Sequence, residues 1–136
     1  MRVIPDSNIL FSALISPHTP PHRLYQAWRQ GVFELVTCDE QLEEIRRSSR
    51  YPKLKNILQP HRVGLMLNNM QSATVIDRLP SGYEAADPND AFLLALADKS
   101  QAHYIVTGDK RAGILSLIAI GQTQIVTASA FCDKML

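Results

Sequence analysis

The segment RVIPDSNILFSALI, residues 2–15, consists of a short apolar stretch, an acidic residue and a second apolar stretch. Pro5 favours extended backbone at Ile4, which predicts a strand over residues 2–5. Residues 8–15 have the character of a helix. A strand followed by an acid and a helix is therefore the unit with which the chain begins.

Strands and helices alternate along the rest of the chain. We expect further strands over residues 34–38, 74–76, 104–107 and 124–127. We expect further helices over residues 22–30, 39 or 40 to about 50, 61–71, 90–101 and 129–135. Five strands that alternate with helices predict an α/β fold, in which helices cover both faces of a parallel sheet.

The length and composition are those of one folded globular domain. The chain has 136 residues and a mass of 15.2 kDa, so we expect a single domain over residues 1–136. Hydrophobic residues make up 46% and charged residues 20%, which excludes a disordered chain. The apolar stretches are far shorter than the ~20 residues of a membrane span. Because Asp6 stands where a signal peptide has its apolar core, we expect a cytoplasmic protein.

The charge distribution is uneven, although the formal net charge is only +1. Residues 45–76 contain six basic residues and no acidic residue, which leaves eight of the 14 basic residues to balance all 13 acidic residues. Such a distribution suits a protein that holds phosphates in one place and cations in another. The alternative is that the basic segment is simply a solvated helix face.

Acidic residues follow the expected strands. Asp6 follows the first strand, and Asp109 follows the strand over residues 104–107. Asp90 begins an apolar helix, and Glu43 and Glu44 both lie in the first turns of the helix after the second strand. In an open α/β sheet, ligands bind beyond the carboxyl ends of the strands, where the strand order reverses. Each acid alone has an ordinary interpretation as a helix cap, a turn residue or a surface residue.

Carboxylates gathered at one edge of a sheet would repel one another unless a cation joined them. Oxygen ligands favour a hard ion, Mg²⁺ or Mn²⁺, over zinc. The four histidines are scattered, and two cysteines cannot form a four-cysteine zinc site or a disulfide framework. We expect Cys38 and Cys132 to be buried thiols.

Several segments together resemble the PIN domain family. They are RVIPDSNILFSALI, LEEIRR followed by YPKL, DPNDAFLLALA, YIVTGDKR and QIVTASAF, in this order over essentially the whole chain. The similarity is closest to the PIN proteins that act as toxins of toxin–antitoxin pairs. It implies a three-layer α/β/α sandwich with a central parallel sheet of about five strands. It also implies a metal-dependent ribonuclease, with a small antitoxin as partner and pairing into homodimers.

The resemblance assigns roles to individual acids. Asp6, Asp90 and Asp109 match the acids that hold Mg²⁺ or Mn²⁺, and Glu44 matches the catalytic acid of the LxEL-type motif. Glu43 and Glu44 differ by ~100° around a helix, so only one of them can face the ion well. The motif favours Glu44.

Other residues are assigned supporting roles. Asn8, Thr107 and Asp87 are expected to support the metal ligands. Flanking phosphates of the RNA are expected to contact basic residues that follow the acids, namely Arg46, Arg50, Lys110 and Arg111. Single-stranded or looped RNA is favoured, because a duplex does not easily enter a concave carboxylate site.

The sequence departs from the family pattern in ways that remove none of the acids. Ser7 stands where Thr is usual, and Pro5 removes one backbone donor from the first strand. Two alternatives remain open from the sequence. One is a PIN-like module that binds RNA or protein without catalysis. The other is a receiver-like signalling domain, for which Asp77 and Lys110 are present but the paired acids after the first strand are missing.

Overall fold

The computed structural model describes residues 1–80, 82–83, 91–108 and 119–136. In these residues, six strands form one sheet in the order β3-β2-β1-β4-β6-β5. Their bounds are β1 (Arg2–Pro5), β2 (Glu34–Cys38), β3 (Thr74–Ile76), β4 (Tyr104–Val106), β5 (Ala119–Ile120) and β6 (Thr123–Val126). The neighbours from β3 to β6 are parallel, whereas β5 pairs with β6 in the antiparallel sense. The predicted α/β fold with a central parallel sheet is confirmed.

Helices follow most of the strands. Their bounds are α1 (Ser7–Ile15), α2 (Pro20–Arg29), α3 (Asp39–Ser48), α4 (Pro52–Lys55), α5 (Pro60–Gln71), α6 (Ala91–Ser100) and α7 (Ala128–Met135). Polar caps set several of the starts: the side chain of Thr19 accepts a hydrogen bond at the start of α2, and that of Thr127 does so at α7. In the described part of the chain, no helix combines the length and apolar character that crossing a membrane requires.

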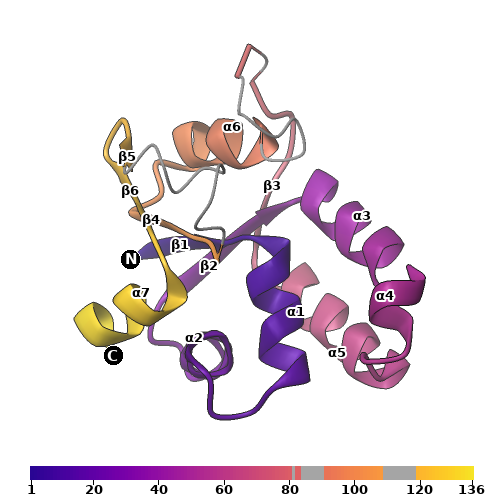
Figure 1. Cartoon of the computed structure of the whole chain (residues 1–136). Helices are drawn as coiled ribbons and strands as arrows, with labels where there is room; N and C mark the ends of the chain where they lie inside the picture. Colours follow the sequence, from indigo (N-terminus) through magenta and orange to yellow (C-terminus); the bar gives the residue numbers. More distant parts are fainter. Residues whose placement is uncertain (81, 84–90, 109–118) are drawn as a thin grey trace.

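Successive side chains of the inner strands point to opposite faces of the sheet. Val3 and Leu35 belong to an apolar cluster with residues of α1, α2, α3, α5 and α7. Ile4 and Val36 belong to a second cluster, which they share with α6. Figure 1 shows α6 on one side of the sheet and α1, α2 and α5 on the other. The sheet is therefore the middle layer, as the alternation of strands and helices predicted.

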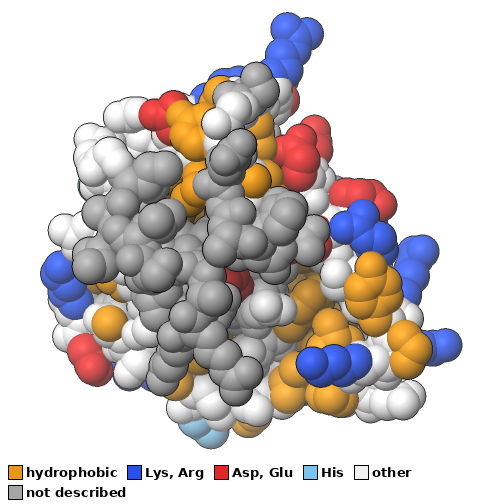
Figure 2. Space-filling view, turned by 45° about the horizontal axis from the view of Figure 1, so that its top comes forward, with side chains coloured by type: hydrophobic (Ala, Val, Ile, Leu, Met, Phe, Trp, Pro, Cys, Tyr) orange, Lys and Arg blue, Asp and Glu red, His pale blue; other side chains and the backbone are white. Residues whose placement is uncertain are grey.

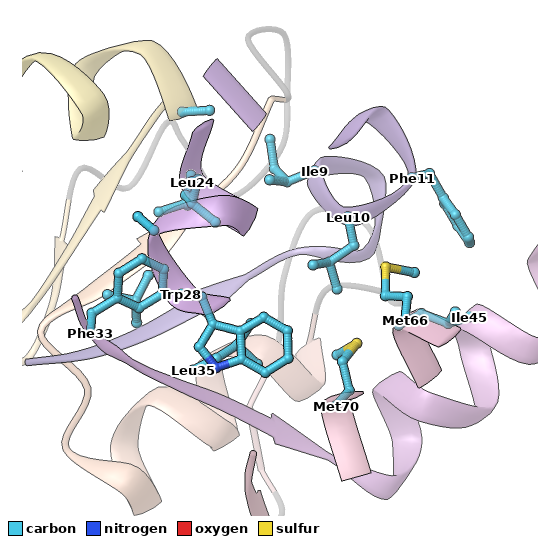
Figure 3. Close-up of a cluster of buried hydrophobic side chains, with 14 of the residues drawn as sticks. Ile9, Leu10, Phe11, Leu24, Trp28, Phe33, Leu35, Ile45, Met66 and Met70 are labelled. Carbon is cyan, nitrogen blue, oxygen red and sulfur yellow. The ribbon is translucent and has the colours of Figure 1, made fainter. Parts of the chain in front are cut away.

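The larger apolar cluster fixes the position of α1. In Figure 3, Leu10 of α1 and Met66 and Met70 of α5 point toward one another. All three side chains are fully buried, as is Leu24 of α2. Because α1 begins immediately after β1, this packing also fixes the point at which the chain leaves the first strand.

Two elements differ from the sequence-based expectation. The helix expected to reach about residue 50 ends at Ser48, and the short helix α4 begins separately at Pro52. The second difference is β5, an edge strand that the sequence pattern did not predict. A two-residue turn joins it to β6, and Gly121 in this turn has a φ of 55°, a conformation that glycine adopts without strain.

Candidate active site

The carboxyl ends of β1 and β4 meet at the point where the strand order reverses. β1 lies between β2 and β4, so the chain moves to one side of β1 first and returns to its other side later. The register pairs Pro5 with Val106, and the backbone N–H of Asp6 donates to the carbonyl of Val106 at 2.9 Å. Asp6 and Thr107 therefore leave neighbouring strands where open α/β sheets bind ligands.

The carboxylate of Asp6 is buried and anchored through both oxygens. Its Oδ1 accepts a hydrogen bond from the backbone N–H of Ile9 at 3.1 Å, which caps α1. Its Oδ2 accepts a hydrogen bond from the Thr107 hydroxyl at 2.6 Å. The exposed fraction is 8% for Asp6 and 2% for Thr107. A cap explains only the first contact, whereas the second joins the two strands across the reversal point.

Glu44 reaches the same region from α3. The hydroxyl of Ser7, the residue after Asp6, donates a hydrogen bond to Oε1 of Glu44. Ser7 is buried and Glu44 is half-buried. This contact joins the start of α1 to α3, so the structure brings Asp6 and Glu44 to one site although 37 residues separate Ser7 and Glu44 in the sequence.

The neighbouring acid, Glu43, faces away from this site. Its side chain is 64% exposed and pairs with Arg46 on the next turn of α3, at 3.7 Å. The two glutamates point in different directions because successive helical residues are rotated by about 100°. Of the two, Glu44 is the one in contact with the start of α1.

Comparison of the sequence with models of protein families identifies the family to which the chain belongs. The family model described as PIN domain matches residues 2–111. The chain belongs to the PIN domain family. PIN domains are generally nucleases and typically use divalent metal ions, which makes a nuclease-type hydrolase the coarse function. A search of curated proteins gave no match.

The described part of this PIN domain offers oxygen ligands at the reversal point. Asp6 and Glu44 supply carboxylates, and the hydroxyls of Ser7 and Thr107 hold these carboxylates in place. Oxygen donors of this kind fit Mg²⁺ or Mn²⁺. Among the described residues, no group of three or more acids, histidines or cysteines could by itself hold a metal ion. The predicted ligands Asp90 and Asp109 lie outside the described residues.

Thiolate chemistry does not compete at this edge of the PIN domain. Cys38 ends β2, close to the start of α3, and its side chain is fully buried. Burial raises the pKa of this thiol to about 12. The thiol therefore stays protonated near neutral pH in the metal-free protein, which makes it a poor nucleophile. Cys132 is also buried, as expected.

A pocket of about 460 Å³ with a basic rim lies between α3, α4 and α5. Its charged lining residues are Arg46, Arg50 and Lys55, and its apolar lining includes Leu58 and Val63. Figure 2 shows Lys and Arg side chains around hydrophobic ones at lower right, on the side where Figure 1 has these three helices. The helix α3 thus contributes both Glu44 and part of this basic pocket.

The remaining predicted residues fall into two groups. Asn8 lies in the first turn of α1 and is exposed. Three other predicted residues, Asp87, Lys110 and Arg111, lie outside the described part of the chain, as do the two predicted metal ligands Asp90 and Asp109.

Sequence reasoning missed two residues of this region. Ser7 was noted only as a departure from the family pattern, although its position directly after Asp6 was a usable signal. Gln41 lies three positions before Glu44 and is fully buried. No periodicity or motif in the sequence distinguishes Gln41 from an exposed polar residue of a helix.

Proposed function

We propose that this PIN domain is a metal-dependent ribonuclease that hydrolyses phosphodiester bonds of single-stranded or looped RNA. The observation that supports this most is the buried Asp6 carboxylate, which is bonded to Thr107 across the strand-reversal point of a nuclease-type fold. The sequence similarity described above extends the proposal to a toxin of a toxin–antitoxin pair. It implies a small antitoxin as partner and pairing into homodimers.

The residues of the chain would divide the chemistry between them. Asp6, with Asp90 and Asp109 as the expected further ligands, would hold the divalent ion. When bound, Mg²⁺ or Mn²⁺ would neutralise phosphate charge and lower the pKa of water. Glu44, held by Ser7, would orient the water for in-line attack on phosphorus and accept its proton. The products would have a 5′-phosphate and a 3′-hydroxyl.

RNA is the proposed substrate because α3 carries Glu44 and also contributes Arg46 to the basic pocket. Arg50 is six residues from Glu44 on the α3 side of the pocket, and Lys55 lies on α4. The four residues from Glu44 to the end of α3 span about 6 Å along the helix, and Arg50 follows two residues later, so a strand with its reacting phosphate at Glu44 could place a flanking phosphate near Arg50. Such contacts position the strand and do not read its bases.

Metal removal is the direct test of the proposed reaction. We expect defined single-stranded and hairpin RNAs to be cleaved in Mg²⁺ or Mn²⁺, and we expect EDTA to reduce cleavage to the no-enzyme rate. The physical reason is that neither the anionic phosphodiester nor neutral water reacts readily without a cation. Excess Mn²⁺ added after EDTA should restore cleavage, measured as 5′-phosphate products on a gel. RNA binding without cleavage in either metal would instead support a binding module.

The basic pocket gives a second prediction. Arg50→Gln should raise KM for RNA with little change in kcat, because a phosphate contact away from the reacting centre contributes binding energy. The salt dependence of log KM should also weaken, by about 0.7 for each lost phosphate contact to a single strand. Arg62→Gln is the matched control, because Arg62 belongs to the same basic segment but does not line the pocket. Equal effects of the two substitutions would show that the pocket does not contact RNA.

A further inference from the structure

The backbone carbonyl of Pro5 lies where the first strand separates from the second. The pairing of β1 with β2 includes Val3 and Leu35, whereas β2 continues to Cys38 beside β3. Proline has no backbone N–H, so Pro5 offers its neighbour only an acceptor. A buried carbonyl at this position needs a donor from another part of the chain.

The side chain of Gln41 supplies this donor. Its Nε2 donates to the carbonyl oxygen of Pro5 at 2.7 Å, and its Oε1 accepts from the hydroxyl of Thr37 at 2.5 Å. Gln41 and Thr37 are both fully buried. The amide has only one workable orientation, because a carbonyl can accept but cannot donate. The Thr37 hydroxyl must then donate to Oε1, which locks the amide.

These contacts hold the Pro5–Asp6 peptide group on both sides. Gln41 binds its carbonyl oxygen, and the Asp6 N–H donates to Val106 on the opposite side. The next group along the chain is the Asp6 carboxylate, which contacts Thr107. Rotation of this peptide group would turn the carboxylate, so the hydrogen bond from Gln41 restricts the direction in which Asp6 leaves the strand.

We propose that Gln41 is a positioning residue, which acts through the Pro5 carbonyl to hold the Asp6 carboxylate in the orientation that binds a divalent ion. Thr37 orients Gln41 through its hydrogen bond to Oε1 and is therefore a positioning residue as well. The inference rests on the proposed function insofar as Asp6 is taken to bind a metal ion. It adds a fully buried amide from α3 to the carboxylates and hydroxyls already described.

The test measures Mn²⁺ binding to the protein alone, by electron paramagnetic resonance titration of free Mn²⁺. Gln41→Met keeps the length of the side chain and removes both hydrogen bonds, and we expect it to weaken Mn²⁺ binding by about 10- to 100-fold, the usual effect of losing a partner of a metal ligand. Thr37→Val, which keeps the shape of Thr37, should weaken binding in the same direction. Thr37→Ser keeps the hydroxyl and should bind Mn²⁺ like the wild type.

A matched control separates positioning from general loss of stability. Thr123→Val removes another buried hydroxyl, which donates to the carbonyl of Ala102 at 2.6 Å near the opposite, amino-terminal edge of the sheet. It should lower the denaturant midpoint without changing Mn²⁺ affinity. If Gln41→Met does not fold, the Mn²⁺ affinity of Thr37→Val tests the proposal instead. The proposal is overturned if these site variants bind Mn²⁺ like the wild type, if Thr123→Val weakens binding equally, or if the wild type binds no Mn²⁺.

Failure of the positioning role of Gln41 can be distinguished from failure of the proposed ribonuclease function. If the Mn²⁺ affinity depends on Gln41 but the wild type cleaves no RNA, the positioning role of Gln41 stands and the ribonuclease function is contradicted. If Gln41→Met cleaves RNA and binds Mn²⁺ as well as the wild type does, the ribonuclease function stands and the positioning role of Gln41 is contradicted.

Discussion

Asp6→Asn should reduce RNA cleavage by more than about 100-fold, because losing the metal ligand itself should cost more than losing one of its partners. The fold should survive. Asparagine caps helices about as well as aspartate, so its Oδ1 can still accept from the Ile9 N–H. Its Nδ2 can donate to the Thr107 hydroxyl, which is both a donor and an acceptor. Initial cleavage rates and denaturant unfolding of the same preparations measure both effects.

Asp6→Ala provides the comparison for this result. Alanine removes both the charge and the cap, so activity should again be lost, and stability should also fall by about 0.5–2 kcal/mol. The two variants together separate the chemical role of the carboxylate from its structural role. Wild-type rates in Asp6→Asn would contradict the assignment of the site, whatever the stability of the variant.

Glu44→Gln should reduce kcat by about 100-fold or more, the usual range for loss of a general acid or base. Glutamine can still accept the hydrogen bond from the Ser7 hydroxyl, so the contact between α1 and α3 persists while the charge and the basic oxygen are lost. Single-turnover cleavage at saturating enzyme measures this effect without the contribution of RNA binding.

Glu43→Gln is the matched variant one residue away. It removes the same charge from the same helix, but from a side chain that faces solvent and pairs only with Arg46 among the ion pairs of the described residues. Such exposed pairs contribute about 0–1 kcal/mol. We therefore expect wild-type kcat and near wild-type stability. If Glu43→Gln lost activity and Glu44→Gln did not, the assignment of the two side chains would be reversed.

The order of the strands and helices was largely predictable because it depends on local signals. The strands over residues 34–38 and 74–76 have the predicted bounds, and the helix expected over residues 61–71 begins one residue earlier. Pro60 and Thr127 mark helix starts that need no tertiary information. The edge strand β5 was not predictable, because two residues have no recognisable period and pair only through the adjoining turn.

The candidate site was predictable only in part. The rule that ligands bind at the carboxyl ends of strands led to Asp6. The family resemblance added Thr107, and the structure joins these two residues by a hydrogen bond. The roles of Asp90 and Asp109 remain predictions, since these residues lie outside the described part of the chain. Gln41 could not be predicted, because its function in the fold depends on a carbonyl 36 residues away.

The sequence by itself determined the α/β class, the alternation of elements and the presence of an acid after the first strand, because each of these depends on residues close together in the chain. The family motif favoured Glu44 over Glu43, and the tertiary structure shows that Glu44 contacts the start of α1 while Glu43 faces solvent. Only the tertiary structure decided that Gln41 completes the bonding of Pro5. These outcomes depend on how α3 is rotated and packed against the sheet. That rotation is set by buried contacts from several elements at once, which no local pattern encodes.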